Sequence, residues 1–189
     1  MDHLEAVVEI KNIINIDFIK KIIPLINKKA KNYLGDRVLY VGATKRGILK
    51  DIRNVKGYQL NFDNPTNIFY WNYIKTEIER LFVYYRTKFP QMASSKINQI
   101  DLLKHSPDSN YKIHIDNCTT TRRALSIIMN LNDGYEGGYL IFTDQKHKEI
   151  KKLKLNKGSI VFFPSNFLYP HSITPIIKGT RYSIVAWLQ

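Results

Sequence analysis

The hydrophobic positions of this 189-residue chain change their period near the middle of the sequence. The first half has helical spacing. One helix is predicted after Asp17, a candidate N-cap, and Pro24 should kink or shorten it. Its apolar positions are Phe18, Ile19, Ile22, Ile23 and Ile26. A longer helix should end at Pro90, and its apolar positions are Ile74, Ile78, Leu81, Phe82, Tyr85 and Phe89. Both apolar stripes are wide enough to pack on a flat surface.

From about residue 97 the pattern becomes that of short strands separated by turn residues. The predicted strands are 97–103, 110–116, 122–131, 138–143, 150–155, 159–163, 168–173 and 180–188. Turn signals stand between them, at Ser106-Pro107-Asp108, Asp133-Gly134, Lys157-Gly158, Pro164-Ser165-Asn166 and Lys178-Gly179. Short strands at this spacing predict a sandwich, barrel or jelly roll. With the helices covering one sheet, the fold class is α+β.

Length and composition indicate one domain over residues 1–189, with helical support at about 1–96 and the strand core at about 97–189. A chain of this size buries roughly 70% of its unfolded surface and folds without disulfides. Cys118 is the only cysteine, which excludes an internal disulfide and fits a reducing compartment. No long apolar run and no signal-like start is present. We therefore expect a soluble, intracellular, cytoplasmic protein that does not insert into a membrane.

The formal charge of +13 suits a polyanionic partner such as nucleic acid or an acidic protein. A lysine-rich composition shared with abundant Ile, Asn, Tyr and Phe is the competing explanation, and the charge does not decide between them. The densest cluster spans a predicted hairpin and is interpreted as a solvated face; it comprises Lys146, Lys148, Lys151, Lys152, Lys154 and Lys157.

The stretch Tyr111–Asn117, "YKIHIDN", places His114 and Asp116 on one face of a predicted strand. Their Cβ atoms are then roughly 7 Å apart, within reach of one ion. Alone, the motif is weak, but His171 follows downstream, and Arg181 comes ten residues after His171. Two imidazoles and a carboxylate form the facial triad that binds Fe(II) and leaves positions open. An arginine on the last strand, on the face of Ser183, is suited to a bidentate grip on a carboxylate.

At these residues the sequence resembles the Fe(II)/2-oxoglutarate-dependent dioxygenases, and among them the prolyl 4-hydroxylase-like group. "VVEIKNIINIDFIKKIIPLIN" is similar to the family's opening strand and helix. The segments "YKIHIDN", "LSIIMNLND", "YEGGYLIF", "LNKGSIVFFPS" and "YPHSITPIIKGTRYSIVAWL" follow the family's core in order. The resemblance implies a double-stranded β-helix, a jelly-roll or cupin-like core with N-terminal helices packed on one sheet.

The resemblance also implies roles for single residues. His114, Asp116 and His171 would bind iron, while Arg181, helped by Ser183, would pair with the distal carboxylate of 2-oxoglutarate. With O2, and with ascorbate as an optional reductant, such an enzyme oxidises 2-oxoglutarate to succinate and hydroxylates an unactivated C–H bond. Tyr111 would contact cosubstrate or substrate, or pack its ring in the core, and Arg123 would reach the substrate, or lie on the surface. Candidates for lining the core are Val161, Phe162, Ile173, Val185 and Trp187.

Other residues receive structural interpretations. Gly137 and Gly138 should serve backbone geometry, and Cys118 should be a small buried residue. His3, His105 and His147 fit no ligand spacing and are predicted to lie on the surface. The chain also departs from the family, which places tyrosines where this chain has the triplets Leu103-Lys104-His105 and Met129-Asn130-Leu131. Asn130 can donate a hydrogen bond instead, and Lys104 can add charge, so the identity of the oxo acid stays open.

The leading functional hypothesis is a hydroxylase of a protein, peptide or free amino acid. Asp116 excludes the halogenase variant, in which halide replaces that carboxylate. A nucleic-acid-directed oxygenase would account for the charge, but the AlkB-type enzymes carry a second arginine where this chain has Trp187. A β-helix binding module without turnover is the third alternative. Specificity should reside in loops 40–66, 104–110 and 143–150. The first of these is compatible with an acidic or phosphorylated substrate, because it contains Lys45, Arg46, Lys50, Arg53 and Lys56. The sequence does not indicate the oligomeric state.

Overall fold

The computed structural model describes residues 3–32, 53–93, 96–117 and 122–189. Its elements are, in chain order, η1 (His3–Ala6), β1 (Val8–Ile10), α1 (Ile16–Lys29), β2 (Lys31–Asn32), β3 (Lys56–Gln59), α2 (Pro65–Lys88), β4 (Ile97–His105), β5 (Tyr111–His114), β6 (Leu125–Asn130), β7 (Glu136–Gly137), β8 (Leu140–Thr143), β9 (Glu149–Leu153), β10 (Ile160–Pro164), β11 (His171–Ile173), β12 (Ile176–Lys178) and β13 (Arg181–Leu188). Each predicted strand has a counterpart that differs by at most three residues at either end.

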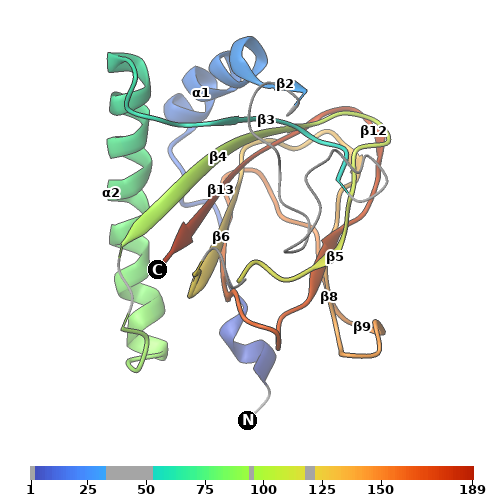
Figure 1. Cartoon of the computed structure of the whole chain (residues 1–189). Coiled ribbons are helices and arrows are strands. Elements are labelled where there is room, and N and C mark those ends of the chain that lie inside the picture. The colour runs from blue at the N-terminus through green and yellow to red at the C-terminus, as the bar shows by residue number, and fades with distance from the viewer. Residues whose placement is uncertain (1–2, 33–52, 94–95, 118–121) are drawn as a thin grey trace.

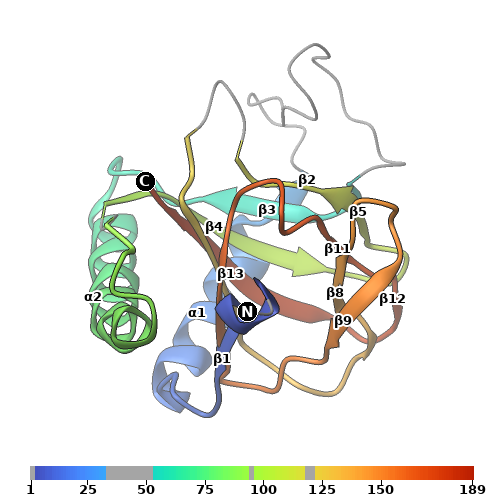
Figure 2. The ribbon, with the colours of Figure 1, turned by 90° about the horizontal axis from the view of Figure 1, so that it is seen from below.

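Two antiparallel sheets form the core of the fold. The larger sheet has the order β1-β10-β6-β13-β4-β3-β2, and the smaller has the order β5-β11-β8-β9. Both helices lie on one side of the larger sheet, and the smaller sheet lies on the other side (Figures 1 and 2). The predicted α+β class, with a double-stranded β-helix core and helices packed on one sheet, is confirmed. Strands β2, β3, β7 and β12 were not predicted; each is short, so its alternation is too brief to read.

Side-chain alternation in the larger sheet divides the interior into two hydrophobic clusters. In β10, Ile160 and Phe162 face the helices, whereas Val161 and Phe163 face the smaller sheet. The same alternation holds in β6 and β13, because successive strand side chains point to opposite faces. Phe162, one of the candidates for lining the core, packs against α2, with its ring 5.6 Å from that of Tyr85. A strand buried on both faces gives no polar residue to mark its inner side, so the sequence does not tell which of its residues face the metal ligands.

The helices differ from their predictions at their ends. The N-cap of α1 is Asn15, whose side chain accepts hydrogen bonds from the backbone N–H groups of Asp17 and Phe18, at 2.7 and 3.2 Å. Asp17, the predicted cap, lies in the first turn. Pro24 lies inside α1, which nevertheless continues to Lys29. Helix α2 begins at Pro65, well before its apolar stripe becomes clear, and ends with Phe89 as C-cap, just before Pro90 as predicted.

Some sequence-based expectations concern residues outside those that the structure describes. Cys118 is one of them, as are Lys45, Arg46 and Lys50 of the predicted specificity loop. Of that basic group, Arg53 and Lys56 are described. Within the described ranges, neither helix combines the length and apolarity that crossing a membrane requires.

Candidate metal centre

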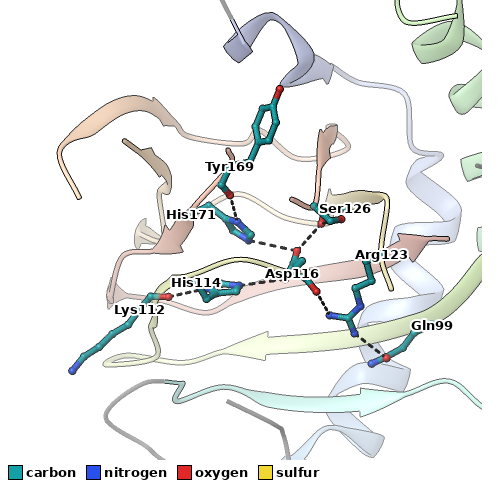
Figure 3. A network of polar contacts seen from close by, with 9 residues as sticks. Gln99, Lys112, His114, Asp116, Arg123, Ser126, Tyr169 and His171 are labelled. Carbon is teal, nitrogen blue, oxygen red and sulfur yellow. Dashed lines mark hydrogen bonds and ion pairs between the residues drawn. The ribbon is translucent and has the colours of Figure 1, made fainter. Parts of the chain in front are cut away.

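Three predicted metal ligands converge between the two sheets, as Figure 3 shows. His114 ends β5 and His171 begins β11, and the two histidines are register partners across this strand pair. Asp116 lies just beyond β5, not within it as the predicted strand 110–116 had placed it. One candidate ligand atom from each residue lies within 4.8 Å of the other two. The Nε2 atoms of His114 and His171 are 3.4 and 3.6 Å from the two carboxylate oxygens of Asp116.

Backbone carbonyls fix the tautomer of both histidines. The Nδ1 of His114 lies 2.8 Å from the carbonyl oxygen of Lys112, and that of His171 lies 3.1 Å from the carbonyl oxygen of Tyr169. Because a carbonyl oxygen only accepts, each Nδ1 carries the proton and donates it. Each ring therefore turns its Nε2 toward Asp116, which is the arrangement that metal-binding histidines adopt.

The Asp116 carboxylate is buried but remains ionised. Burial by itself raises its pKa, yet the positive potential of His171, the hydrogen bond and charge of His114, and the Ser126 hydroxyl together hold the pKa well below its ordinary value. Ser126 Oγ donates to Asp116 Oδ2 at 2.6 Å. Burial and the neighbouring His114 lower the pKa of His171 to about 4, against the opposing effect of Asp116. The donor set is one carboxylate and two imidazoles, which fits a divalent transition metal.

Arg123, for which the sequence offered either a substrate contact or a surface position, supports the turn that carries Asp116. Its guanidinium donates to the Asp116 carbonyl oxygen at 3.4 Å and to Gln99 Oε1 at 3.1 Å. The same group lies 3.7 Å from the centroid of the Trp187 ring, in cation–π distance. Its backbone N–H donates to Asn117 Oδ1 at 3.2 Å. These contacts tie the residues after β5 to the inner face of the larger sheet (Figure 3).

Tyr111 covers one face of a metal-ligand candidate. Its ring stacks on that of His114, with 3.5 Å between centroids and 20° between planes. The Arg53 guanidinium lies 4.7 Å from the centroid of the phenol ring. Burial raises the pKa of the Tyr111 hydroxyl, an effect that Arg53 partly offsets. The positive side chain of Arg53 therefore contacts the ring that stacks on His114, one of the candidate metal ligands.

A second polar group lies deeper in the barrel, around Arg181. Arg181 is 1% exposed, and its Nε donates to Asn130 Oδ1 at 3.1 Å. Its Nη2 and the hydroxyl of Ser183 are buried, with no hydrogen-bond partner in the part of the chain that the structure describes. Burial lowers the pKa of Arg181, and Tyr135 opposes that shift. A buried cation with an unmatched N–H fits an anionic ligand, so this end of the barrel suits the carboxylate of a cosubstrate.

Asn130 belongs to this polar group, where it accepts a hydrogen bond from Arg181. Its Nδ2 donates to the carbonyl oxygens of Asn132 and Leu155, at 2.8 and 3.0 Å. Its Oδ1 accepts from Arg181 and, at 3.2 Å, from the Tyr135 hydroxyl. Both amide hydrogens are therefore used within the protein, so Asn130 orients Arg181 and has no hydrogen left to donate to a ligand.

The sequence interpretation missed several site residues. Ser126, Ser165 and Tyr135 have no motif that singles them out. His105, predicted to lie on the surface, is 3% exposed, so that prediction was wrong. Strand β4 extends through His105, whose side chain follows Leu103 on the inner face. The alternation of the predicted strand, continued by two residues, would have placed it there.

The two glycines after Glu136 are required by the backbone. Gly137 and Gly138 have φ values of +77° and +63°. A Cβ on Gly137 would overlap the carbonyl oxygen of Pro175, and one on Gly138 would meet the Ile176 side chain. This geometry permits the β7–β12 pairing beside Arg181. The expectation that both glycines serve backbone geometry is confirmed.

Fold and site together define a double-stranded β-helix protein with a two-histidine, one-carboxylate metal site. The model of the 2OG-Fe(II) oxygenase superfamily matches residues 100–189. This match confirms, over residues 100–189, the resemblance inferred from the motifs.

Curated relatives match about half of the chain. A PKHD-type hydroxylase of Prochlorococcus marinus is 36% identical over 98 residues, which are 50% of this chain and 42% of that protein. A PKHD-type hydroxylase of Crocosphaera subtropica is 30% identical over 100 residues, covering 49% of this chain and 43% of that protein. The match therefore spans less than half the length of these relatives.

Solved structures match the fold over the full chain. A prolyl 4-hydroxylase of Pseudomonas putida has a TM-score of 0.72 at 15% identity and covers 100% of this chain and 95% of its own. A prolyl hydroxylase of Trichoplax adhaerens, in complex with a peptide fragment of the hypoxia inducible factor oxygen degradation domain, has a TM-score of 0.75 at 17% identity, covering 99% and 86%. The fold is thus that of the prolyl 4-hydroxylase-like group.

Proposed function

We propose that this protein is an iron- and 2-oxoglutarate-dependent dioxygenase that hydroxylates an unactivated C–H bond. The observation that carries the proposal is the convergence of His114, Asp116 and His171, whose ligand atoms lie within 4.8 Å of one another. The buried Arg181, with an unmatched Nη2 on the inner face of the larger sheet, supports a dicarboxylate cosubstrate. The superfamily match over residues 100–189 supports the same assignment of Fe(II), 2-oxoglutarate and O2.

The three ligands are already arranged to receive a cation. The backbone carbonyls that accept from each Nδ1 hold both Nε2 atoms toward Asp116, and Ser126 orients the ionised Asp116. With O2 as the oxidant and 2-oxoglutarate as the co-reductant that leaves as succinate and carbon dioxide, bound iron would supply the chemistry that hydroxylates a C–H bond. Phe142 and Phe163 pack near the His171 ring, with centroids 6.0 and 4.8 Å away, and exclude water from its sides. Ascorbate as an additional reductant stays a prediction.

A protein, peptide or amino-acid substrate is the class that we propose. One structure with the same fold, the Trichoplax adhaerens prolyl hydroxylase, holds a peptide. Arg53 lies over Tyr111 beside His114, which favours an acidic group near the site. The first substrate to test is a proline-containing peptide with acidic residues.

Nucleic acid is the less favoured alternative, and two contacts weaken it. Lys151 and Lys154 of the predicted basic cluster donate to the backbone carbonyl oxygens of Leu4 and Tyr135, at 3.3 and 3.2 Å. Those two lysines therefore hold the fold together as well as adding charge. Methylated oligonucleotides belong in the substrate screen beside the peptides. The substrate class is the one that releases succinate above the background measured without added substrate.

Metal and cosubstrate chemistry can be tested without knowing the substrate. Anaerobic addition of Fe(II) and 2-oxoglutarate should give a weak visible charge-transfer band, and oxygen should then yield slow, uncoupled succinate. His171→Ala should abolish both signals. His147→Asn is the matched control, because His147 is exposed at a turn with a φ of +64° and lies outside the site. Absence of both signals in the wild type, or their persistence in His171→Ala, would refute the proposal and favour a binding module.

A further inference from the structure

The inner faces of β4 and β13 end in a group of buried polar side chains. His105 is the direct cross-strand partner of Arg181, and Ser183 lies on the same face of β13 as Arg181. His105, Arg181 and Ser183 are 3%, 1% and 0% exposed. Neighbouring residues on one face of an antiparallel pair have their side chains in contact range. The three polar groups therefore share one enclosed space between the sheets.

Unmatched hydrogen-bonding atoms gather in this space. Both ring nitrogens of His105, Nη2 of Arg181 and Oγ of Ser183 are buried, and none has a hydrogen-bond partner among the residues that the structure describes. Buried polar atoms are almost always paired, since leaving them unpaired costs free energy. Several such atoms on one face indicate a ligand that completes them.

The neighbouring donors are already used. Asn130 donates both amide hydrogens to backbone carbonyls, and the Tyr135 hydroxyl donates to Asn130. Lys104, suggested by the sequence as a source of charge, points to the other side of β4 and donates to Asn27 Oδ1 at 2.6 Å. The groups left to bind a ligand are Arg181, Ser183 and His105.

The charge state of these groups favours a carboxylate. Burial, together with the charges of Arg181 and Arg53, lowers the pKa of His105 well below its ordinary value, so the ring is neutral at pH 7. A neutral imidazole has one N–H to donate and does not repel the adjacent guanidinium. One fixed cation with two neutral donors in a dry space matches a single carboxylate.

We propose that His105 donates its ring N–H to the distal carboxylate of the 2-oxo acid cosubstrate and is a specificity-determining residue for it, alongside Arg181 and Ser183. This inference rests on the proposed dioxygenase function. It assigns a donor to a position where the chain lacks the tyrosine expected from its family resemblance, namely the triplet Leu103-Lys104-His105.

The test measures the affinity of a 2-oxo acid for the Fe(II)-loaded protein under anaerobic conditions. The visible charge-transfer band is the signal that reports binding. Two acids are compared: 2-oxoglutarate, and 2-oxobutyrate, which chelates through the same end but has no distal carboxylate. His105→Leu should weaken 2-oxoglutarate binding by about ten- to a hundredfold, the effect of a hydrogen bond to a charged group. Binding of 2-oxobutyrate and of Fe(II) alone should be unchanged. His105→Gln, which restores an N–H donor, should recover much of the 2-oxoglutarate affinity.

Further variants and outcomes keep the result decisive. His105→Phe, a donor-less ring of similar size, replaces the leucine variant if that one does not fold, and His147→Asn is the exposed control. An equal loss for both acids would show a merely structural role, and no loss for 2-oxoglutarate would refute the contact; in both outcomes the proposed function stands. If the wild type bound neither acid, the proposed function itself would fall, and this inference with it.

Discussion

Removing the Ser126 hydroxyl should weaken metal binding more than it disturbs the fold. Ser126 is fully buried, and its Oγ lies 2.6 Å from Asp116 Oδ2 and 2.7 Å from Ser165 Oγ. An ionised carboxylate only accepts, so the Ser126 proton goes to Asp116 and Ser165 donates to Ser126. Ser126→Ala therefore removes the one side-chain donor outside the triad that the described structure places on this carboxylate.

The size of the effect expected for Ser126→Ala follows from the charge on Asp116, which accepts the Ser126 hydrogen bond. A hydrogen bond to a charged group is worth about 1.5–3 kcal/mol. Loss of a group that orients a metal ligand typically costs about ten- to a hundredfold in metal affinity. The apo protein should also lose stability, because the carboxylate stays buried with fewer partners; about 3–12 °C in Tm is expected for a chain of this size.

Anaerobic titration with Co(II) or Fe(II), followed by absorption or calorimetry, measures the affinity, and thermal unfolding measures the stability. Ser165→Ala is the matched control, since Ser165 is equally buried but contacts Ser126 and not Asp116. Its effect on metal affinity should be clearly smaller. The reasoning is refuted if Ser126→Ala changes metal affinity by less than about twofold, or if both alanine variants weaken the metal equally.

Three other predictions concern the surroundings of the site. Arg123→Ala should weaken metal binding by about tenfold, because it frees the Asp116 turn from Gln99 and Trp187. Arg123→Lys should recover little of this affinity, because lysine lacks the planar guanidinium that makes these contacts. Equal affinities of Arg123→Ala and the wild type in the Co(II) titration would contradict the prediction. Gly137→Ala should lower the free energy of unfolding in urea far more than Gly134→Ala. Both glycines have φ near +80°, but of the two only Gly137 has no room for a Cβ, which would overlap the Pro175 carbonyl oxygen. Similar losses in the two variants would show that the left-handed backbone alone decides. Because the pKa of His105 is lowered on folding by burial, Arg181 and Arg53, the folded state binds fewer protons than the unfolded state below about pH 6.5. Wild-type stability should therefore fall faster than that of His105→Gln as pH drops below that value, by at most about 1.4 kcal/mol per pH unit; parallel urea-midpoint curves from pH 7 to 5 would contradict it.

Local patterns in the sequence were sufficient for most element types and for the candidate metal ligands. Alternation and turn residues placed β4, β5, β6, β8, β9, β10, β11 and β13 to within three residues at either end. The spacing of His114, Asp116, His171 and Arg181 within predicted strands led to the triad and to the buried arginine. These features are local, since a strand's period and a motif's spacing do not depend on what packs against them.

The sequence failed where a side chain's role depends on its neighbours. In β10 every residue from Ile160 to Phe163 is apolar, so the sequence could not tell that Phe162 packs on α2 while Phe163 packs near His171. The α1 cap went to Asn15 and not Asp17, because both are good caps and the backbone entering the helix decides between them.

The tertiary structure alone decided how the buried polar groups are paired. His105 faces Arg181, and Arg123 lies over Trp187, although the members of each pair are far apart in the sequence. These pairs follow from strand register and from the closure of one sheet over the other, and a shift of one residue would turn each side chain to the opposite face. The sequence supplies the ligands of the candidate centre, whereas the sheet register determines which polar atoms remain unmatched and therefore what the barrel can bind.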